Sequence, residues 1–362
     1  MVYFQASTTL YIVWVTDACR GFMSVLFYLA PMAELSHRAL REIIEEFGGC
    51  DGYFTEMISA PALLAGGSFE KWYIDAAPKP EKCVFQLVGS DSGSISAAAA
   101  ILDKLECAGI DINMGCSAPL IRKTGAGAAW MASIDRAGEL ISKVRPAVKR
   151  RLSVKLRTGF KDDFEYLVRF CRRLEEEGVE LITLHPRLVT EKFKRLARWE
   201  YVGKLREELK IPVAGNGDIG SAEELVKRAN GPCDAVMVGR AAVKTPWIFA
   251  EAKELLKEEV HTEAQRHRGT EEEGEERRCS SSVSPCLCVK SSPSIEDVGL
   301  RFLGLLAAYQ PPEFHVSRAK RFFNYFCDNL KWGTFVKNQI NREDTLSGIE
   351  KTWREGMRTV QI

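Results

Sequence analysis

Asp111-Ile112-Asn113-Met114-Gly115-Cys116 is the stretch that decides the fold of this chain. It starts as a short apolar run, ends in a thiol, and leads into the glycine-rich turn Lys123-Thr124-Gly125-Ala126-Gly127. A strand that ends in this way places an amide and a thiol side by side where a loop opens. An α/β barrel carries its catalytic groups at such strand ends. The stretch therefore predicts a barrel strand with a functional cysteine at its carboxyl end.

Segments typical of strands and helices alternate on both sides of this stretch. We expect strands at residues 25–30, 52–55, 83–88, 110–114, 152–157, 181–185, 212–215 and 234–239. We expect helices at 35–47, 92–107, 128–149, 164–177, 222–229 and 246–259. Strands and helices alternating in this way over ~235 residues predict a closed (β/α)8 TIM barrel. An open, doubly wound sheet is the alternative, but no Gly-x-Gly-x-x-Gly follows the first strand.

The barrel, expected over residues 25–260, does not account for the whole chain of 362 residues. Residues 1–24 hold apolar runs too short for the ~18 apolar residues of a membrane span, and no basic segment of a secretory signal precedes them. We expect these residues to be an extension that the fold does not need. Residues 261–294 are rich in charge and serine, which predicts a disordered linker or insertion. Residues 295–362 look helical again and predict a small C-terminal helical domain.

Charge is unevenly distributed along the chain. The formal net charge of +1 argues against a uniformly basic nucleic-acid binder. Basic residues nevertheless gather between Lys143 and Arg206, where they can follow a phosphate backbone or simply line solvated helix faces. In the tail, basic residues from Arg318 to Arg342 alternate with aromatic residues from Phe322 to Trp332. This pattern suits RNA binding, while aromatic core residues with solvated basic neighbours are the alternative.

The cysteines indicate a reducing environment. The chain has 11 of them, scattered and without a Cys-x-x-Cys pair, which favours free thiols over a disulfide framework. Cys286-Leu287-Cys288 resembles a metal clip, but no histidine or second cysteine pair lies at zinc-finger spacing. We expect a cytoplasmic protein without a metal or a membrane segment, and nothing in the sequence implies an oligomer.

Polar residues and glycines gather at the expected strand ends. Gly217 and Gly239 follow the seventh and eighth strands, the usual phosphate site of such barrels, where they let backbone amides approach an anion. Arg240 adds a charge-assisted partner. A phosphate-bearing cofactor is therefore expected. The residues at these ends are Pro31, Met32, Ala33, Gln86, Asn113, Cys116, Lys155, Arg157, His185, Arg187, Asn216, Gly217, Asp218, Gly239 and Arg240.

These motifs, in this order, resemble the tRNA-dihydrouridine synthases, flavoenzymes that reduce uridines in tRNA. The resemblance covers roughly residues 26–258 and, more loosely, the helical tail. Its motifs lie at residues 29–33, 55–60, 86–91, 111–116, 154–159, 214–219 and 238–242. The resemblance implies FMN as cofactor, NADPH as reductant, tRNA as partner and Cys116 as proton donor. The implied FMN ligands are Pro31, Met32, Ala33, Gln86, Lys155, His185, Asn216, Gly217, Asp218, Gly239 and Arg240.

The residue types suit this chemistry. Reduction of the uracil 5,6 double bond needs a hydride at C6, which reduced flavin supplies from N5, and a proton at C5. A thiol with an ordinary pKa of ~8.5 is protonated at neutral pH, so Cys116 can act as general acid. Lys155 can stabilise negative charge on the flavin, and Asn113 can hold the edge of a flipped uracil. We also expect Arg187, Arg122 and Lys123 to bind substrate.

The chain departs from the family pattern near the substrate. Ser117 and Leu120 stand where the family has a proline and a lysine, and Arg122 and Lys123 can supply part of the missing charge. Pro186 replaces a glycine and stiffens its loop. Two alternative functions follow. One is a flavin-barrel reductase of a free pyrimidine or small enone, like the dihydroorotate dehydrogenases; the other is an RNA-binding relative with weakened catalysis.

Overall fold

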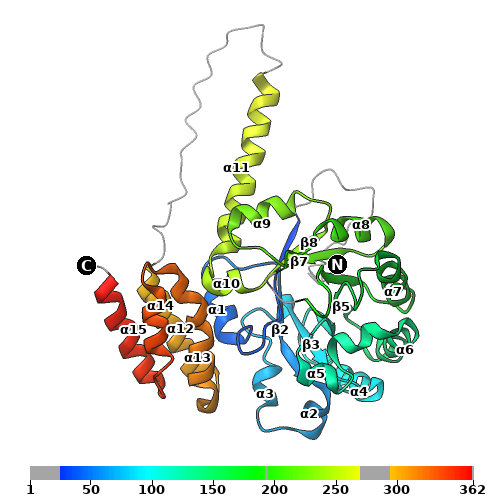
Figure 1. Ribbon diagram of the computed structural model, residues 1–362, viewed down its shortest axis with the longest axis horizontal. Coiled ribbons are helices and arrows are strands. Elements are labelled where there is room, and N and C mark those ends of the chain that lie inside the picture. Colours follow the sequence, from blue (N-terminus) through cyan, green and yellow to red (C-terminus); the bar gives the residue numbers. More distant parts are fainter. Residues whose placement is uncertain (1–24, 192–194, 270–293, 361–362) are drawn as a thin grey trace, which may run out of the picture.

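The computed structural model describes residues 25–191, 195–269 and 294–360. In these ranges, parallel strands β1 to β8 form a closed barrel in chain order, and β1 pairs with β8 (Figure 1). The strands are β1 (Leu26–Leu29), β2 (Gly52–Ser59), β3 (Cys83–Val88), β4 (Gly109–Met114), β5 (Arg151–Arg157), β6 (Leu181–His185), β7 (Val213–Asn216) and β8 (Ala235–Val238). The predicted TIM barrel is confirmed. The predicted extension at residues 1–24 lies outside the described residues.

The helices of the barrel follow their strands, with some departures from the prediction. They are α1 (Arg38–Glu46), α2 (Ala60–Ala65), α3 (Glu70–Tyr73), α4 (Ser92–Leu102), α5 (Pro119–Lys123), α6 (Ile134–Val144), α7 (Phe164–Glu176), α8 (Glu200–Glu208), α9 (Ala222–Ala229), α10 (Arg240–Lys244) and α11 (Ile248–Gly269). The single helix predicted at 128–149 is wrong. Its first part is a 3-10 turn, and α6 begins only after Ser133, whose hydroxyl accepts a hydrogen bond from the Arg136 amide. The sequence prediction also missed α8.

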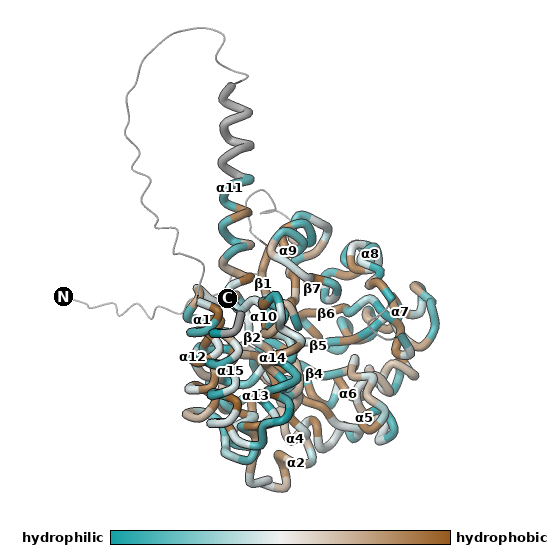
Figure 2. The backbone as a smooth tube through the Cα atoms, turned by 60° about the vertical axis from the view of Figure 1, so that its left-hand side comes forward, coloured by the Kyte–Doolittle hydropathy of each residue, from teal (hydrophilic) through white to brown (hydrophobic). Residues whose placement is uncertain are grey.

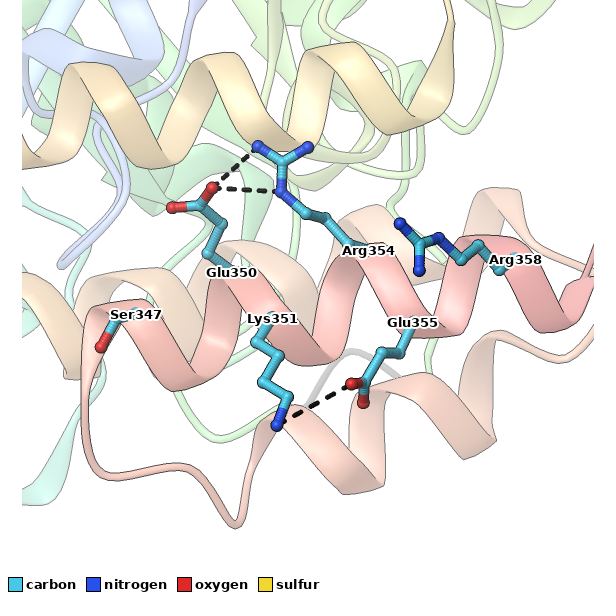
Figure 3. Close-up of a pocket in the computed structure, with 6 residues that line it drawn as sticks. All are labelled: Ser347, Glu350, Lys351, Arg354, Glu355 and Arg358. Atoms are coloured by element: carbon cyan, nitrogen blue, oxygen red, sulfur yellow. Dashed lines mark hydrogen bonds and ion pairs between the residues drawn. The ribbon is translucent and has the colours of Figure 1, made fainter.

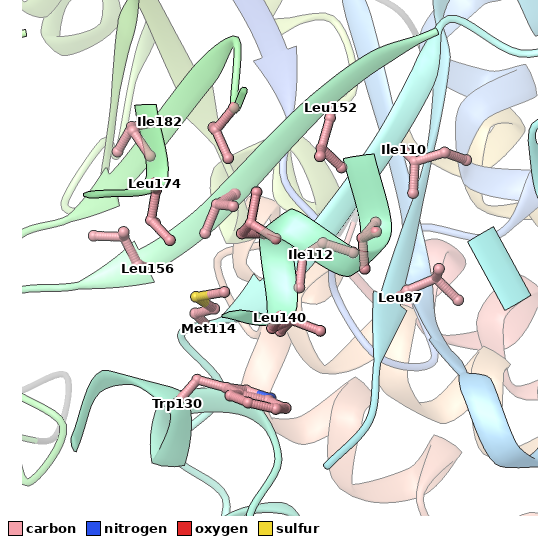
Figure 4. Close-up of a cluster of buried hydrophobic side chains, with 14 of the residues drawn as sticks. Leu87, Ile110, Ile112, Met114, Trp130, Leu140, Leu152, Leu156, Leu174 and Ile182 are labelled. Carbon is pink, nitrogen blue, oxygen red and sulfur yellow. The ribbon is translucent and has the colours of Figure 1, made fainter. Parts of the chain in front are cut away.

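Side chains along the strands alternate between two environments. On β4, Ile110, Ile112 and Met114 belong to a cluster packed under the surrounding helices (Figure 4). Asp111 and Asn113 alternate with them and face the barrel interior, as the two-residue period of a strand requires. The interior is thus lined with polar groups near the carboxyl ends of β3 to β5. Lower in the barrel it is filled by a smaller apolar cluster around Tyr28, Phe54 and Met237.

The tail forms four helices: α12 (Ile295–Tyr309), α13 (Pro312–Phe326), α14 (Gly333–Ile340) and α15 (Leu346–Val360). Both views place them beside α1 and α10 (Figures 1 and 2). Phe322, Phe323 and Phe326 are fully buried, and the Phe322 ring stacks on Phe302 with 3.7 Å between the ring centroids. The alternative in which the tail aromatics form a core is therefore correct for these three residues.

One basic residue of the tail is a structural link to the barrel. Arg318 is 2% exposed, and its Nη2 lies 2.9 Å from Oε2 of Glu56, which is 4% exposed. Arg318 also donates to the side-chain oxygen of Gln310. It cannot contact RNA from this position, so the prediction that Arg318 belongs to a solvent-facing basic pattern is wrong. Glu56 lies in the carboxyl half of β2, where its carboxylate is buried. A buried carboxylate is costly without an opposite charge, and the Arg318 guanidinium supplies that charge.

The boundary predicted at residue 260 falls inside a helix. α11 runs to Gly269, so the first part of the predicted linker is helical, and α11 extends away from the barrel (Figure 1). The rest of that linker, residues 270–293, lies outside the described residues. Within the described ranges, no helix is both long and apolar enough to span a membrane. The cysteines of the same ranges are free thiols.

Candidate active site

Cys116 lies in the loop that follows β4, and its backbone is held from two sides. The side-chain oxygen of Asn113 accepts hydrogen bonds from the amides of Gly115 (3.1 Å) and Cys116 (2.9 Å). The Cys116 carbonyl accepts a bond of 2.9 Å from the amide of Ala128. Cys116 is partly exposed as a residue, unlike the buried cysteines of the core. A fixed backbone in a partly exposed loop suits a group that must reach a substrate.

Gly127 lets the chain pass close to this loop. Its φ is +59°, and a Cβ atom there would lie 2.8 Å from the carbonyl oxygen of Cys116. Only glycine tolerates both the left-handed backbone and this close approach. The glycine-rich turn that the sequence places after the cysteine therefore shapes the wall behind it.

Lys155 stands on the neighbouring strand, where it is the register partner of Asn113. Its ammonium donates to the side-chain oxygen of Asn216 (2.9 Å), and Asn216 in turn donates to the carbonyl of Met237 (2.7 Å). Burial lowers the pKa of Lys155 to about 8, while the nearby carboxylate of Asp111 acts in the opposite direction. The group is thus a cation at neutral pH, at the mouth of the barrel and near Cys116.

His185 and Arg187 form a buried pair after β6. Arginine can only donate, so the 2.9 Å contact from Arg187 Nη1 makes His185 Nε2 an acceptor. Burial and the surrounding cations hold the pKa of His185 well below its ordinary value, which keeps the ring neutral with its proton on Nδ1. Arg187 is 1% exposed and also pairs with Asp218. The guanidinium of Arg187 is thus enclosed by protein, and the role of Arg187 in substrate binding stays a prediction.

The residues after β7, β8 and β1 surround the same mouth. Gly217 has a φ of +119°, and a Cβ there would lie 2.9 Å from the His185 ring. Asp218 also has a positive φ, of 53°, and its carboxylate accepts from the Ala197 amide. Arg240 is exposed at the start of α10, while Gly239 lies near Met32. Pro31 and Met32 are partly exposed and Ala33 is exposed.

Two predicted binding residues lie below the accessible surface. Gln86 is fully buried, and its amide donates to Asp111 (2.7 Å) and accepts from Asn113 (2.8 Å). Asn113 is 6% exposed, and its side-chain oxygen is used by the Cys116 loop. Both side chains support the Cys116 loop from beneath, and their predicted roles in cofactor and substrate binding stay predictions.

Arg157 lies at the end of β5, and the sequence alone predicted no role for it. Its guanidinium donates to the carbonyls of Gly115 (3.1 Å), Leu188 (2.8 Å) and Glu191 (3.2 Å). Arg157 thus joins the Cys116 loop to the loop after β6. Its position at the inward-facing end of β5 was the available signal.

Arg122 and Lys123 lie on α5, a short helix that follows the Cys116 loop, and both are exposed. Leu120 on the same helix is 83% exposed. The missing family lysine therefore leaves an apolar side chain facing solvent, with two cations close behind it in the sequence. These positions are open to a large partner.

A second exposed feature lies on α15, where charges of both signs alternate (Figure 3). Glu350 pairs with Arg354 at 2.8 Å, and Lys351 pairs with Glu355 at 3.9 Å. Ion pairs within one helix leave little charge to attract an anion. We therefore do not assign a binding site to this face of α15.

The fold and the site together define a barrel enzyme with a thiol, an ammonium group and an exposed arginine, Arg240, at the carboxyl ends of its strands. The family description "Dihydrouridine synthase (Dus)" matches residues 28–278. The chain belongs to this family of flavin-dependent oxidoreductases.

Named relatives agree with this assignment. The chain is 34% identical over 239 residues to the probable tRNA-dihydrouridine synthase of Aquifex aeolicus, covering 64% of this chain and 74% of that protein. It is 29% identical over 231 residues to the tRNA-dihydrouridine(16) synthase of Ralstonia nicotianae, covering 61% and 70%. It is 28% identical over 229 residues to a tRNA-dihydrouridine(47) synthase [NAD(P)(+)]-like protein of Xenopus tropicalis, covering 63% and 36%.

Proposed function

We propose that this protein uses FMN and NADPH to reduce uridine to 5,6-dihydrouridine in tRNA. The observation that carries the proposal is that one barrel mouth holds both the partly exposed Cys116, in the loop after β4, and the Lys155 ammonium on the adjacent strand β5. The names of the relatives support tRNA as substrate, and one of them supports a nicotinamide reductant. Work on tRNA also favours the cytoplasm as the place of action.

The residues at the mouth fit a phosphate-bearing flavin. Arg240 is exposed at the start of α10 and follows Gly239, which is partly exposed. Lys155 suits the electron-rich end of a reduced ring, since a fixed cation stabilises developing negative charge. Met32 is partly exposed and uncharged, and His185 is neutral, so neither adds charge at this mouth. When bound, FMN would supply the hydride for C6 of the uracil.

Cys116 supplies the proton in this proposal. Its backbone is fixed by Asn113 and Ala128, so the thiol can be presented to C5 without reorganisation of the loop. Arg157 holds the same loop against the segment after β6. Arg122 and Lys123, exposed beyond the thiol, are positioned to pair with phosphates of the tRNA backbone.

The tail offers a surface for the rest of the tRNA. Trp332 and Phe335 are 63% and 58% exposed near the start of α14, and the Lys331 ammonium lies 5.8 Å from the Trp332 ring centre. Exposed aromatics beside cations suit unstacked bases and phosphates. A reductase of a free pyrimidine would need no such surface, which favours the tRNA substrate.

An absorbance spectrum followed by NADPH oxidation tests the proposal. Purified protein should carry flavin bands and should oxidise NADPH faster when unmodified tRNA is added, with dihydrouridine appearing in the tRNA. Cys116→Ala serves as the matched control, and it should retain flavin while losing dihydrouridine formation. Oxidation that ignores tRNA but responds to free uracil derivatives would favour the small-molecule alternative. A protein that takes up no flavin would exclude the proposal.

A further inference from the structure

A chain of buried side chains connects β5 to the Cys116 loop. The Ser153 hydroxyl donates to Oδ1 of Asp111 (2.6 Å), and the Gln86 amide nitrogen donates to Oδ2 (2.7 Å). The Gln86 oxygen accepts from Asn113 (2.8 Å), whose own oxygen accepts from the loop amides of Gly115 and Cys116. Gln86, Asp111 and Ser153 are register neighbours on β3, β4 and β5, which places them in one layer of the barrel interior.

Each end of this chain has a fixed hydrogen-bonding character. Backbone amides can only donate, and an ionised carboxylate can only accept. An amide side chain has one donating end and one accepting end, so the two amides between these termini can satisfy all partners in one orientation. Asp111, Gln86 and Ser153 are at most 1% exposed and Asn113 is 6% exposed, so water offers little alternative. A reversed amide would set acceptor against acceptor at a buried contact, which is costly.

We propose that Asp111 is a positioning residue that orients the Cys116 loop through Gln86 and Asn113. The carboxylate turns the Gln86 nitrogen toward itself, so the Gln86 oxygen must face the Asn113 nitrogen. The Asn113 oxygen must then face the loop, where it holds the amides of Gly115 and Cys116. We call Asp111, Gln86 and Asn113 the amide relay.

The charge state of Asp111 agrees with this role. Burial raises the pKa of Asp111 to about 6, while hydrogen bonds from Ser153 and Gln86 act in the opposite direction. The carboxyl is therefore mainly ionised at neutral pH and acts as a pure acceptor. An apolar residue in this layer would avoid the desolvation cost of a carboxylate. The hydrogen bonds that Asp111 directs, and its attraction to Lys155, offset that cost.

A reversal experiment distinguishes a directional relay from simple packing. Asn113→Asp places a second acceptor opposite the Gln86 oxygen and should change the alkylation rate of Cys116 by iodoacetamide at least tenfold at pH 7.5. Asp111→Asn still permits the native direction and should change that rate less than threefold. In the Asp111→Asn/Asn113→Asp double variant, the Gln86 amide can turn over. Its oxygen then accepts from the new amide at position 111, its nitrogen donates to the new carboxylate at position 113, and every partner is satisfied. The double variant should return to within threefold of the parent.

Peptide-level mass spectrometry isolates the Cys116 signal from the other thiols, and Cys116→Ala identifies the background. A double variant that reacts like Asn113→Asp, or worse, would overturn the relay. So would an Asn113→Asp protein that reacts like the parent. If Asn113→Asp does not fold, recovery of a native circular dichroism spectrum in the double variant supports the relay, and failure of both variants to fold contradicts it.

The role of the Cys116 loop in proton delivery rests on the function proposed above. The orientation of the loop by the amide relay does not depend on that function. Alkylation needs neither flavin nor tRNA. A parent protein without tRNA-dependent turnover would remove the proposed function while leaving the alkylation pattern as the test of the relay.

Discussion

Replacement of Arg318 by methionine tests the buried link between tail and barrel. The change keeps much of the side-chain volume but leaves Glu56, 4% exposed, without its cation. Burial already raises the pKa of Glu56, and Arg318 is the largest influence in the opposite direction. Without Arg318 the buried carboxyl should take up a proton rather than stay charged.

The magnitude follows from that protonation. Keeping a carboxyl protonated at pH 7, when it would ionise near pH 4.3 in the unfolded chain, costs about 3.7 kcal/mol. This agrees with the ~3–5 kcal/mol lost when one partner of a buried pair is removed. At pH 5 the same cost falls to about 1 kcal/mol. A raised folded-state pKa means that the folded variant binds more protons than the unfolded chain, so its deficit grows as pH rises above 4.3.

Urea unfolding followed by circular dichroism at pH 5, 6 and 7 measures this dependence. The difference between parent and Arg318→Met should increase by up to about 1.4 kcal/mol per pH unit wherever Glu56 is ionised in the parent. Arg318→Met combined with Glu56→Gln is the matched control, since a neutral amide needs no cation, and its deficit should not change with pH. A deficit that is independent of pH in Arg318→Met would refute the reasoning, because it would show that lost packing rather than a buried carboxyl sets the cost.

Three further predictions concern the barrel mouth. Cys116→Ala should retain flavin and lower dihydrouridine formation by about 10²–10⁴-fold, measured by single-turnover assays on tRNA. Lys155→Met, without cofactor, should be more stable than the parent at pH 7 by up to roughly 3 kcal/mol. The pKa of Lys155 is lowered from 10.5 to about 8, so its cost is full below pH 8 and disappears above pH 10.5, where urea unfolding should find the two proteins nearly equal. Gly217→Ala should cost about 1–3 kcal/mol and lower flavin content, because φ is +119° and the new Cβ would meet the His185 ring. Gly220→Ala, whose Cβ would meet nothing within 4 Å, should leave both measurements unchanged.

The barrel was predictable because its signal is repeated and local. Along β4 and β5, apolar residues at every second position mark the outward side of each strand, and helices follow at regular intervals. The boundary of β2 was less accessible to sequence reasoning. That strand runs to Ser59 through an irregular register between Phe54 and Met57, which a pattern of strict alternation does not reveal.

The direction of individual side chains was harder to predict than their strand. The sequence correctly placed Lys155, His185 and Asn216 at strand ends, yet it could not show that Arg187 turns back into the protein. The inward direction of Arg187 depends on Asp218, which follows a different strand, β7, and whose carboxylate pairs with the Arg187 guanidinium. A long-range partner of this kind decides burial and leaves no mark in the local pattern.

In the tail, the sequence likewise could not predict which aromatic side chains are buried. Phe322 and Trp332 belong to one basic and aromatic pattern in the sequence, but the first is fully buried and the second is 63% exposed. Residue type and spacing cannot separate them, because what differs is whether α12 or α15 covers the position.

The contacts between tail and barrel bear on how the site is built. Glu56 accepts from the backbone amide of Glu34, which follows the Pro31-Met32-Ala33 segment and has a positive φ of 63°. The other carboxylate oxygen of Glu56 pairs with Arg318 of the tail. A strained residue persists where surrounding contacts determine its conformation, and here the determining carboxylate is itself held by the tail. The tail therefore contributes to the shape of the rim beside the candidate cofactor site, in addition to any surface that it offers to RNA. Because the α1 side of the barrel and the tail also share one apolar cluster, we expect the two parts to unfold together rather than as separate modules.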